Sequence, residues 1–366
     1  MRSNSSSFSS NEEENKNSKR WISSELRELA SFKTGRLNSN AAVKDGLYPF
    51  FTTAPRTYRI NDYAFDQDAI LLGGNNANGI FQIKRYSGKF NAYQRTYVIS
   101  VDEKSPISND YLFYAIKIQL GLLRNSSLGT ATRFLTKPML DSLIISYPDD
   151  YDEMNYIART MKVIDEKIEN NKQINHHLEQ IAQTIFTELC SEGEHAVLSD
   201  ILTVCYGKDH KRLGNGAIPC YGSGGVMRYV DEALYNCESV LIPRKGSLNN
   251  VLYINEPFWT VDTMFYTHMM QPNVAKFVYF TVRNLDLAGM NVGSAVPSMT
   301  TAVLNALGIV LPSKDNLARF EEIVSPMFLQ MQTIRAESAQ LAFTRDTLLP
   351  KLMSGELSAV GIQAAK

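Results

Sequence analysis

The stretch at 216–223 reads GAIPCYGS, and the stretch at 46–53, which begins 170 residues earlier, reads GLYPFFTT. Both consist of a glycine, two apolar or aromatic positions, a proline, and then aromatic or small residues that end in a hydroxyl side chain. If this likeness continues in the same order on both sides, the chain is a tandem duplication.

The likeness does continue on both sides of the two stretches. Upstream, LRELASFKTGR at 26–36 matches LSDILTVCYGK at 198–208. Downstream, a run from glycine to proline at 129–148 matches another at 293–312, and the offset has drifted from 172 to 164 residues. Insertions and deletions in loops explain this drift, whereas chance resemblance would not keep the blocks in order. The sequence therefore predicts two copies of one domain.

Each copy contains short apolar runs that are bounded by Gly, Asn and Pro. DAILLGG at 68–74 and SVLIPRKG at 239–246 have the length and flanking residues of strands followed by turns. A helix-like segment follows in each copy, at 109–120 and at 272–284. The pattern predicts a mixed α/β (α+β) domain of roughly 120 residues in each copy.

A different pattern follows each copy, at 152–190 and 315–352, where glycine is absent and apolar residues recur at spacings of four and three. This is the a/d seam of a coiled coil, in the same register 163 residues apart. The first seam is Ile157, Met161, Ile164, Ile168, Asn171, Asn175, Leu178, Ala182, Ile185 and Leu189, and the second is Phe320, Val324, Met327, Met331, Ile334, Ser338, Leu341, Arg345, Leu348 and Leu352.

A single helix with such a stripe normally packs on its own domain. Here each helix is about 35 residues long, or roughly 50 Å, which exceeds the width of a domain of this size. Polar residues within the seam (Asn171, Asn175, Ser338) are of the kind that fix register. We therefore expect an antiparallel coiled coil, with Gly193 and Gly355 as helix stops. Apolar residues beside the seam leave surface for partner helices or for the flanking domains: Ile174, Ile181, Phe186, Phe328, Leu329 and Leu349.

The predicted fold class is mixed α/β, with two pseudo-symmetric globular domains separated by an antiparallel coiled coil of two long helices. The predicted segments, in chain order, are a disordered tail (1–20), a first recognition domain (21–150), a first spacer helix (151–192), a second recognition domain (193–312), a second spacer helix (313–357) and a C-terminal tail (358–366).

Composition sets broad limits on function. The chain has 366 residues, 44% of them hydrophobic, and a net charge of −1. No apolar run approaches the ~20 residues that span a bilayer, and the N-terminus lacks the apolar core of a secretory signal. The four cysteines contain no C-x-x-C pair, which argues against zinc and against a disulfide scaffold. We expect a cytoplasmic protein.

The order of these blocks resembles the DNA-specificity subunit of type I restriction–modification systems, over about residues 21–357. The resemblance rests on the openings at 26–36 and 198–208, on IPCYGSGGV, on the run from GSAVPSMT to IVLP, and on the closing LLPKLMSGEL. It implies that each copy is a target-recognition domain for one half of a split, asymmetric sequence in double-stranded DNA. The helices would set the gap between the halves. The first copy departs from this pattern, because it has YPFFTTAP at 48–55 where the second copy has IPCYGSGG.

The same resemblance implies partners rather than catalysis by this chain. The partners would be two adenine-specific DNA methyltransferase subunits and the ATP-dependent restriction subunits. S-adenosylmethionine, ATP and magnesium would then bind to those subunits, and this chain would bind no cofactor or metal.

A search for catalytic motifs agrees with a non-catalytic chain. There is no Pro-Pro, which an amino-methyltransferase motif requires, no P-loop, and Met227 stands where a dinucleotide fingerprint needs its third glycine. Pro148-Asp149 with Asp165-Glu166-Lys167 fits a loose nuclease pattern, but its second half lies on a heptad helix rather than on adjoining strands. We therefore expect no catalytic residues.

DNA contacts are expected from basic and amide residues in glycine-rich loops, where Arg can pair with guanine and Asn with adenine. The first copy (21–150) has 15 Lys and Arg against 12 Asp and Glu, the second (196–312) has 8 of each, and 151–195 is near −5. The candidates are Lys33, Arg36, Arg56, Arg59, Asn75, Asn76, Asn78, Lys84, Arg85 and Arg133 in the first copy, and Lys208, Lys211, Arg212, Tyr221, Ser223, Arg228, Arg244, Lys245, Asn249 and Asn250 in the second. For each, an ordinary solvated loop residue is the alternative.

Two other functions remain open from the residues alone. One is a coiled-coil scaffold whose two globular domains bind proteins without reading DNA. The other, less favoured, is a nuclease that uses the Pro148-Asp149 pattern. Selection of a split, asymmetric motif from a random duplex pool would separate the DNA-reading function from both alternatives.

Overall fold

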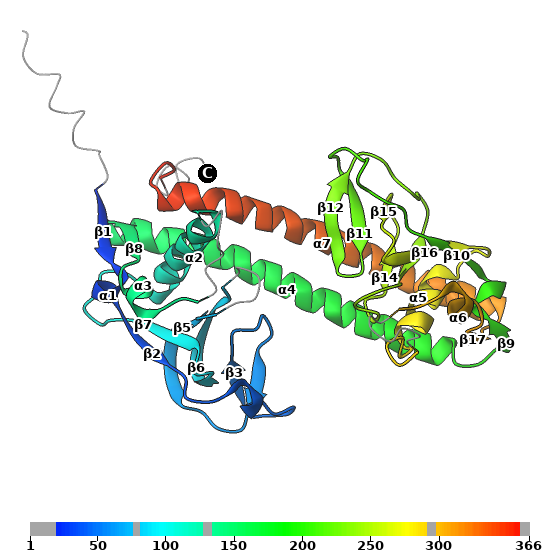
Figure 1. Ribbon diagram of the computed structural model, residues 1–366, viewed down its shortest axis with the longest axis horizontal. Helices are drawn as coiled ribbons and strands as arrows, with labels where there is room; N and C mark the ends of the chain where they lie inside the picture. Colours follow the sequence, from blue (N-terminus) through cyan, green and yellow to red (C-terminus); the bar gives the residue numbers. More distant parts are fainter. Residues whose placement is uncertain (1–19, 76–80, 127–133, 291–297, 359–366) are drawn as a thin grey trace, which may run out of the picture. The chain divides into compact units, whose positions relative to one another are not determined.

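A computed structural model describes residues 20–75, 81–126, 134–290 and 298–358. The chain divides into two compact units, the first made of 1–170 with 337–366 and the second of 171–336. Each unit contains one sequence copy together with one part of each of two long helices (Figure 1). The division therefore cuts through both long helices rather than falling at their ends.

The first unit is built on a six-stranded sheet with the order β2-β7-β5-β6-β3-β4. Its pairs are antiparallel, except that β3 runs parallel to β6. A separate antiparallel ribbon joins β1 to β8. The elements are β1 (Trp21–Glu25), α1 (Leu26–Leu29), β2 (Ala30–Thr34), η1 (Ser39–Ala41), β3 (Tyr48–Phe51), β4 (Tyr58–Ile60), β5 (Phe65–Gly73), β6 (Ile83–Ala92), β7 (Thr96–Val101), α2 (Asn109–Ser126), α3 (Lys137–Asp141) and β8 (Ile144–Pro148).

The second unit repeats this topology in two smaller sheets, ordered β10-β16-β13-β14 and β12-β11-β15. Strand β11 runs parallel to β15, as β3 does to β6, and β9 pairs with β17. The elements are β9 (Glu194–Val197), η2 (Leu198–Asp200), β10 (Leu202–Tyr206), β11 (Ile218–Gly222), β12 (Gly225–Val230), β13 (Ser239–Pro243), β14 (Leu252–Ile254), β15 (Trp259–Thr260), β16 (Met264–Met269), α5 (Ala275–Arg283), α6 (Thr301–Asn305) and β17 (Gly308–Leu311).

The repeated stretch at 46–53 and 216–223 forms the same strand in both units. Tyr48 of β3 pairs with Ile60, and Ile218 of β11 pairs with Val230, so the register is also repeated 170 residues on. The glycine that opens the stretch has a packing role, because a Cβ on Gly46 would lie 2.3 Å from the backbone nitrogen of Ile60. The prediction of two pseudo-symmetric copies of one mixed α/β fold is confirmed.

Each unit has its own apolar core between its main sheet, its crossing helix and its helix parts. In the first unit Ile70 of β5 and Tyr111 of α2 are buried together with Ile157 of the first long helix. In the second unit Ile242 of β13 and Phe277 of α5 are buried in a second cluster. The apolar runs predicted as strands are the buried second half of β5, from Ala69 to Gly73, and the whole of β13, both in the interior of their sheets.

The two long helices are α4 (Tyr151–Leu189) and α7 (Lys314–Met353). In the first unit, Asp165 of α4 accepts a hydrogen bond from Arg345 of α7 at 2.6 Å, and Lys167 pairs with Glu337 at 3.4 Å. The order of these contacts shows that the two helix parts run antiparallel in that unit (Figure 1).

In the second unit, the ring of Phe186 on α4 lies 6.0 Å from that of Phe320 on α7. Each of the twenty seam positions is buried or half-buried. By contrast Ile174, Ile181 and Leu329, which flank the seam, are 41%, 48% and 65% exposed. Among the residues that the structure describes, no helix is both long enough and apolar enough to cross a bilayer.

Candidate nucleic-acid interface

In the first unit, four connections meet at one end of the sheet, which we call the first loop end: 35–38, 52–57, 74–75 and the turn 93–95. The backbone nitrogen of Gln94 donates to the carbonyl of Leu37 at 2.9 Å, and that of Gly74 donates to Arg95 at 2.7 Å. These bonds hold loops that are distant in sequence beside one another. The candidates Arg36, Arg56 and Asn75 therefore come to the same end of the sheet.

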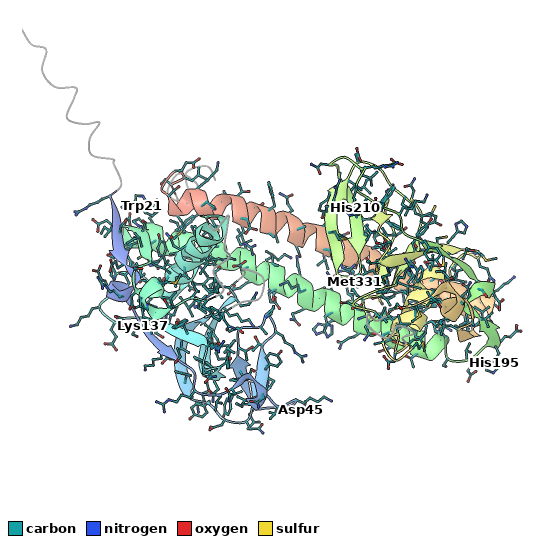
Figure 2. All side chains as sticks on the ribbon, in the orientation of Figure 1. Trp21, Asp45, Lys137, His195, His210 and Met331 are labelled. Carbon is teal, nitrogen blue, oxygen red and sulfur yellow. The ribbon has the colours of Figure 1, made fainter. Side chains whose placement is uncertain are left out.

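The second unit brings its equivalent connections together in the same way, at the second loop end: 207–217, 222–224, 244–250 and the turn 261–263. Lys208 donates its backbone N–H to Thr260 at 2.8 Å, and Arg244 donates its own to Thr263 at 2.8 Å. The side chain of Asn250 donates to the carbonyl of Ser223 at 2.9 Å. Figure 2 labels His210 in this region and Asp45 in the corresponding connection of the first unit.

Seven candidates have exposed side chains at which no hydrogen bond or ion pair is found within the described residues. Arg56 lies with its guanidinium 5.8 Å from the ring of Tyr58, an interaction that leaves its N–H groups available. Exposed Arg and Lys on loops held by a rigid sheet are suited to phosphates and base edges. The seven are Lys33, Arg36 and Arg56 in the first unit and Lys208, Lys211, Arg212 and Asn249 in the second.

Two other candidates anchor loops. Arg59 of β4 donates to the carbonyls of Gly46 and Leu47, each at 3.0 Å. Arg228 of β12 donates to the carbonyls of Leu213 and Gly214, at 2.7 and 2.9 Å. Each arginine thus fastens the connection that precedes β3 or β11, from neighbouring rather than equivalent positions of the hairpin.

Two neighbours in β6 are also engaged within the first unit. Lys84 donates to the carbonyl of Ala54 at 3.3 Å and to the Thr57 hydroxyl at 3.1 Å, and burial lowers the pKa of its amine. Arg85 makes two hydrogen bonds to Asp68, at 3.2 and 3.0 Å, and contacts Asp110 at the start of α2. Arg85 therefore belongs to an ion cluster between the sheet and α2.

The predicted segment 242–250 is partly engaged. Arg244 donates to the carbonyl of Asp262 at 3.1 Å and lies over the ring of Tyr206, while Lys245 is 3.8 Å from the Asp262 carboxylate. Tyr221 is 8% exposed, and burial raises the pKa of its hydroxyl to about 12. Tyr221 therefore offers little surface to a ligand.

The remaining candidates lie at the loop ends or outside the described residues. Ser223 is half-buried and lies at the second loop end, while Asn75 forms an isolated bridge with Phe134. Asn76, Asn78 and Arg133 lie outside the described residues. The structure adds Arg95, which is exposed in the turn of the first loop end. Sequence reasoning missed it because its segment NAYQRT has no glycine, the signal that selected the candidate loops.

The residues of the nuclease-like pattern serve the helix pairing. The carboxylate of Asp165 accepts hydrogen bonds from Tyr114 at 3.0 Å and from Arg345 at 2.6 Å, and Lys167 pairs with Glu337. Within the described residues, no group of three or more His, Cys, Asp or Glu side chains is placed to hold a metal ion. These contacts give Asp165 and Lys167 a structural role.

The family model for the type I restriction modification DNA specificity domain matches residues 18–180, which cover the first copy and most of α4. The type I restriction enzyme EcoDI specificity subunit of Escherichia coli is 38% identical over 165 residues, which are 45% of this chain and 35% of that protein. Over residues 18–180 this chain is therefore similar to the type I DNA specificity domain.

Two further comparisons cover more of the specificity subunit. The type I restriction enzyme MjaIX specificity subunit of Methanocaldococcus jannaschii is 23% identical over 304 residues, 69% of this chain and 70% of that protein. The crystal structure of the type I restriction-modification S subunit from M. genitalium covers 92% of this chain and 97% of its own, with a TM-score of 0.63 and 19% identity. The match to the EcoDI subunit spans about a third of that protein. The fold, by contrast, is shared over nearly the whole of the S subunit from M. genitalium.

Proposed function

We propose that this chain is the non-catalytic subunit that reads DNA for a type I restriction–modification complex. The first loop end would read one half of a split target and the second loop end the other. What carries the proposal is the repetition of one loop end in two copies, each bearing exposed basic side chains such as Arg36 and Lys208. Because other side chains at the two ends differ, the target is asymmetric.

The proposed partners are two adenine methyltransferase subunits and the restriction subunits. The methyltransferases, positioned over the half-sites, would flip out the target adenine and supply S-adenosylmethionine, while ATP and magnesium would act in the restriction subunits. This chain contributes placement and sequence discrimination. Support comes from the match of residues 18–180 to the type I DNA specificity domain and from the structural use of Asp165 and Lys167.

Selection from a random duplex pool, with the co-expressed methyltransferase, tests the proposal. We expect a split, asymmetric motif. Arg36→Ala should erode one half of it and Lys208→Ala the other, by about 1–3 kcal/mol per lost base contact. If a variant loses only a phosphate contact, its affinity should fall by the same factor for all DNA sequences. The slope of log affinity against log salt concentration should then decrease by about 1. Lys104→Ala, exposed beyond the opposite end of β7, is the control. Enrichment of no motif would favour a protein-binding scaffold.

A second test concerns the spacer. Removing one heptad from each of α4 and α7 shortens each helix by roughly 10 Å. We expect the gap between the half-sites to fall by about 3 base pairs at ~3.4 Å per pair, with both half-motifs unchanged. An unaltered gap would argue against a spacing role for the helices.

A further inference from the structure

The second unit contains an open groove of about 940 Å³ between the hairpin β11–β12, strand β14 and the first half of α7. Tyr229 of β12 and Tyr253 of β14 lie on one side, and Glu322 and Leu329 of α7 lie on the other. We call it the acidic groove. Nothing in the DNA-reading proposal uses it.

The floor of the acidic groove carries excess negative charge. Lys276, only 4% exposed, lies between two carboxylates, 2.8 Å from Glu238 and 2.6 Å from Glu321. Tyr253 donates to Glu238, and Ser325 donates to Glu321 at 2.6 Å. The second oxygen of Glu321, Oε2, is buried and accepts no hydrogen bond within the described residues. One ammonium group therefore offsets two carboxylates.

The rim adds to this charge. Glu256 and Glu322 are exposed, and Arg335 is the other charged residue of the lining. The lining thus holds four glutamates against Lys276 and Arg335, a balance of −2. Such a surface repels phosphate and attracts a cation. DNA is therefore an unsuitable occupant.

The walls are apolar and open to solvent. Leu329 is 65% exposed and Tyr229 is 55% exposed, while Phe328 and Ile254 form buried wall beneath them. A lone ammonium ion needs neither this volume nor these walls. Exposed Leu and Tyr beside a patch of charge are typical of a polypeptide interface, where an apolar anchor is flanked by ion pairs.

The corresponding helix face of the first unit lacks this chemistry. By the 163-residue repeat of the heptads, Glu321 corresponds to Ala158, Glu322 to Arg159 and Leu329 to Glu166. The acidic groove is therefore a property of the second copy, not of the shared skeleton.

We propose that the acidic groove is a docking site for a basic segment of a partner polypeptide, one that places Lys or Arg against Glu256 and Glu322 and a large apolar side chain against Leu329. Because the first copy reverses the charge at Glu322, two identical partner chains would not find equivalent docking sites. The inference rests on the proposed function only in that it requires a partner subunit.

The test uses the full-length chain and a fluorescein-labelled amphipathic helix of 14 Lys and Leu residues, with a matched Glu and Leu peptide. We expect the lysine peptide to bind and to weaken as salt rises, and the glutamate peptide to bind at least ten-fold more weakly. The double variant Glu256→Lys/Glu322→Lys should lower the affinity at least ten-fold, and Leu329→Ser several-fold. Glu166→Lys, at the heptad position equivalent to Leu329, is the control.

Failure of the lysine peptide to bind, or equal binding of the two peptides, would each overturn the proposal. So would an unchanged affinity in the double variant, whose substitutions are both exposed and leave the core intact. Duplex selection separates the two proposals. If the motif is still enriched while the peptide fails, only the docking site falls; if the peptide binds and no motif is enriched, only the DNA-reading function falls.

Discussion

The two copies differ in the strand that follows β5 in the first unit and β13 in the second. In the first unit β6 runs unbroken from Ile83 to Ala92 and joins all six strands into one sheet. In the second unit the corresponding chain is split into β14 and β15, and the sheet is split with it. Pro257 lies in the gap and cannot donate a backbone hydrogen bond, which explains the break. Both loop ends form nevertheless, so the skeleton tolerates a broken strand.

In both copies an arginine fastens the connection before the first strand of the repeated hairpin, but the copies differ in the turn of the loop end. Arg59 and Arg228 fasten equivalent connections, whereas Arg95 in the turn of the first loop end is replaced by Thr263 in the second. The two loop ends therefore differ at a position that a ligand could contact. This difference is what an asymmetric target requires of two domains with one ancestor.

The largest expected effect tests the shared skeleton. Gly46→Ala and Gly216→Ala each place a Cβ 2.3 Å from a backbone atom, of Ile60 and Val230 respectively. Each should destabilise its own unit by roughly 3 kcal/mol, because the backbone must move to make room. Hydrogen exchange resolved by residue would locate the loss in one unit at a time.

Gly121→Ala and Gly308→Ala are the controls, since a Cβ there meets no atom within 4 Å. Unequal losses at Gly46 and Gly216, or losses no greater than in the controls, would show that the two connections are not equivalent.

A smaller effect should distinguish the two ion clusters. Lys276→Met leaves Glu238 and Glu321 together without their shared counter-ion. Because their side chains are 30% and 19% exposed, we expect a loss of about 2 kcal/mol in chemical denaturation. Arg85→Met in the first unit should cost less, because the Arg85 side chain is 25% exposed against 6% for Lys276, and Lys162 remains 3.4 Å from Asp110 as a counter-ion.

Adding Glu321→Gln to Lys276→Met should restore part of the stability, since it removes one of the two like charges. No recovery in the double variant would mean that the loss comes from packing of the lysine stem rather than from charge.

The fold was predictable from the sequence because apolar residues recur at regular spacings and whole blocks recur in the same order. Strands, paired helices and the duplication all follow from apolar spacing and repeated order, and the seam positions are buried or half-buried. The structural roles of single residues were harder to predict. Gly355 ends α7 in the left-handed conformation, with φ of 78°, as expected of a helix stop. Gly193 follows α4 for another reason: a Cβ there would lie 2.1 Å from the carbonyl oxygen of Leu311, a contact that only the fold creates.

The candidate interface was predictable as a set of loops but not as a set of side chains. Sequence identifies Arg36 and Arg59 alike as basic residues near glycine, yet only the fold shows that Arg59 is bonded to two carbonyls. The acidic groove was beyond sequence reasoning, because its lining comes from β12, β14, α5 and α7, which no local pattern connects.

The next prediction separates anchors from readers. Arg59→Lys and Arg228→Lys keep the charge but lose the paired hydrogen bonds to carbonyls, and each should cost about 1 kcal/mol of stability. Arg36→Lys should leave stability unchanged, because its side chain makes no such bond within the described residues. Thermal unfolding in parallel with duplex binding measures both. A stability loss in Arg36→Lys equal to that in Arg59→Lys would contradict the division.

The smallest expected effect is a pH dependence confined to the second unit. Burial raises the pKa of Glu179, but hydrogen bonds from Tyr279, at 2.5 Å, and from Arg283 outweigh it, so the pKa is lowered overall. A lowered folded-state pKa stabilises the protein above the unfolded value of about 4.3, and this contribution is lost as the pH falls through the folded pKa. The stability difference between the wild type and Glu179→Gln should therefore be constant above about pH 5 and shrink below pH 4.3.

Urea unfolding at a series of pH values from above pH 5 to below pH 4.3, followed by exchange at amides of the second unit, measures that difference. Glu188→Gln, an exposed position on the same helix, is the matched control and should show no such trend. If Glu179→Gln keeps the wild-type pH slope, the bonds to Tyr279 and Arg283 contribute no ionisation-dependent stability. The second copy would then hold α4 by packing alone, through contacts such as Phe186 against Phe320, and the charged contacts there would serve only to set register.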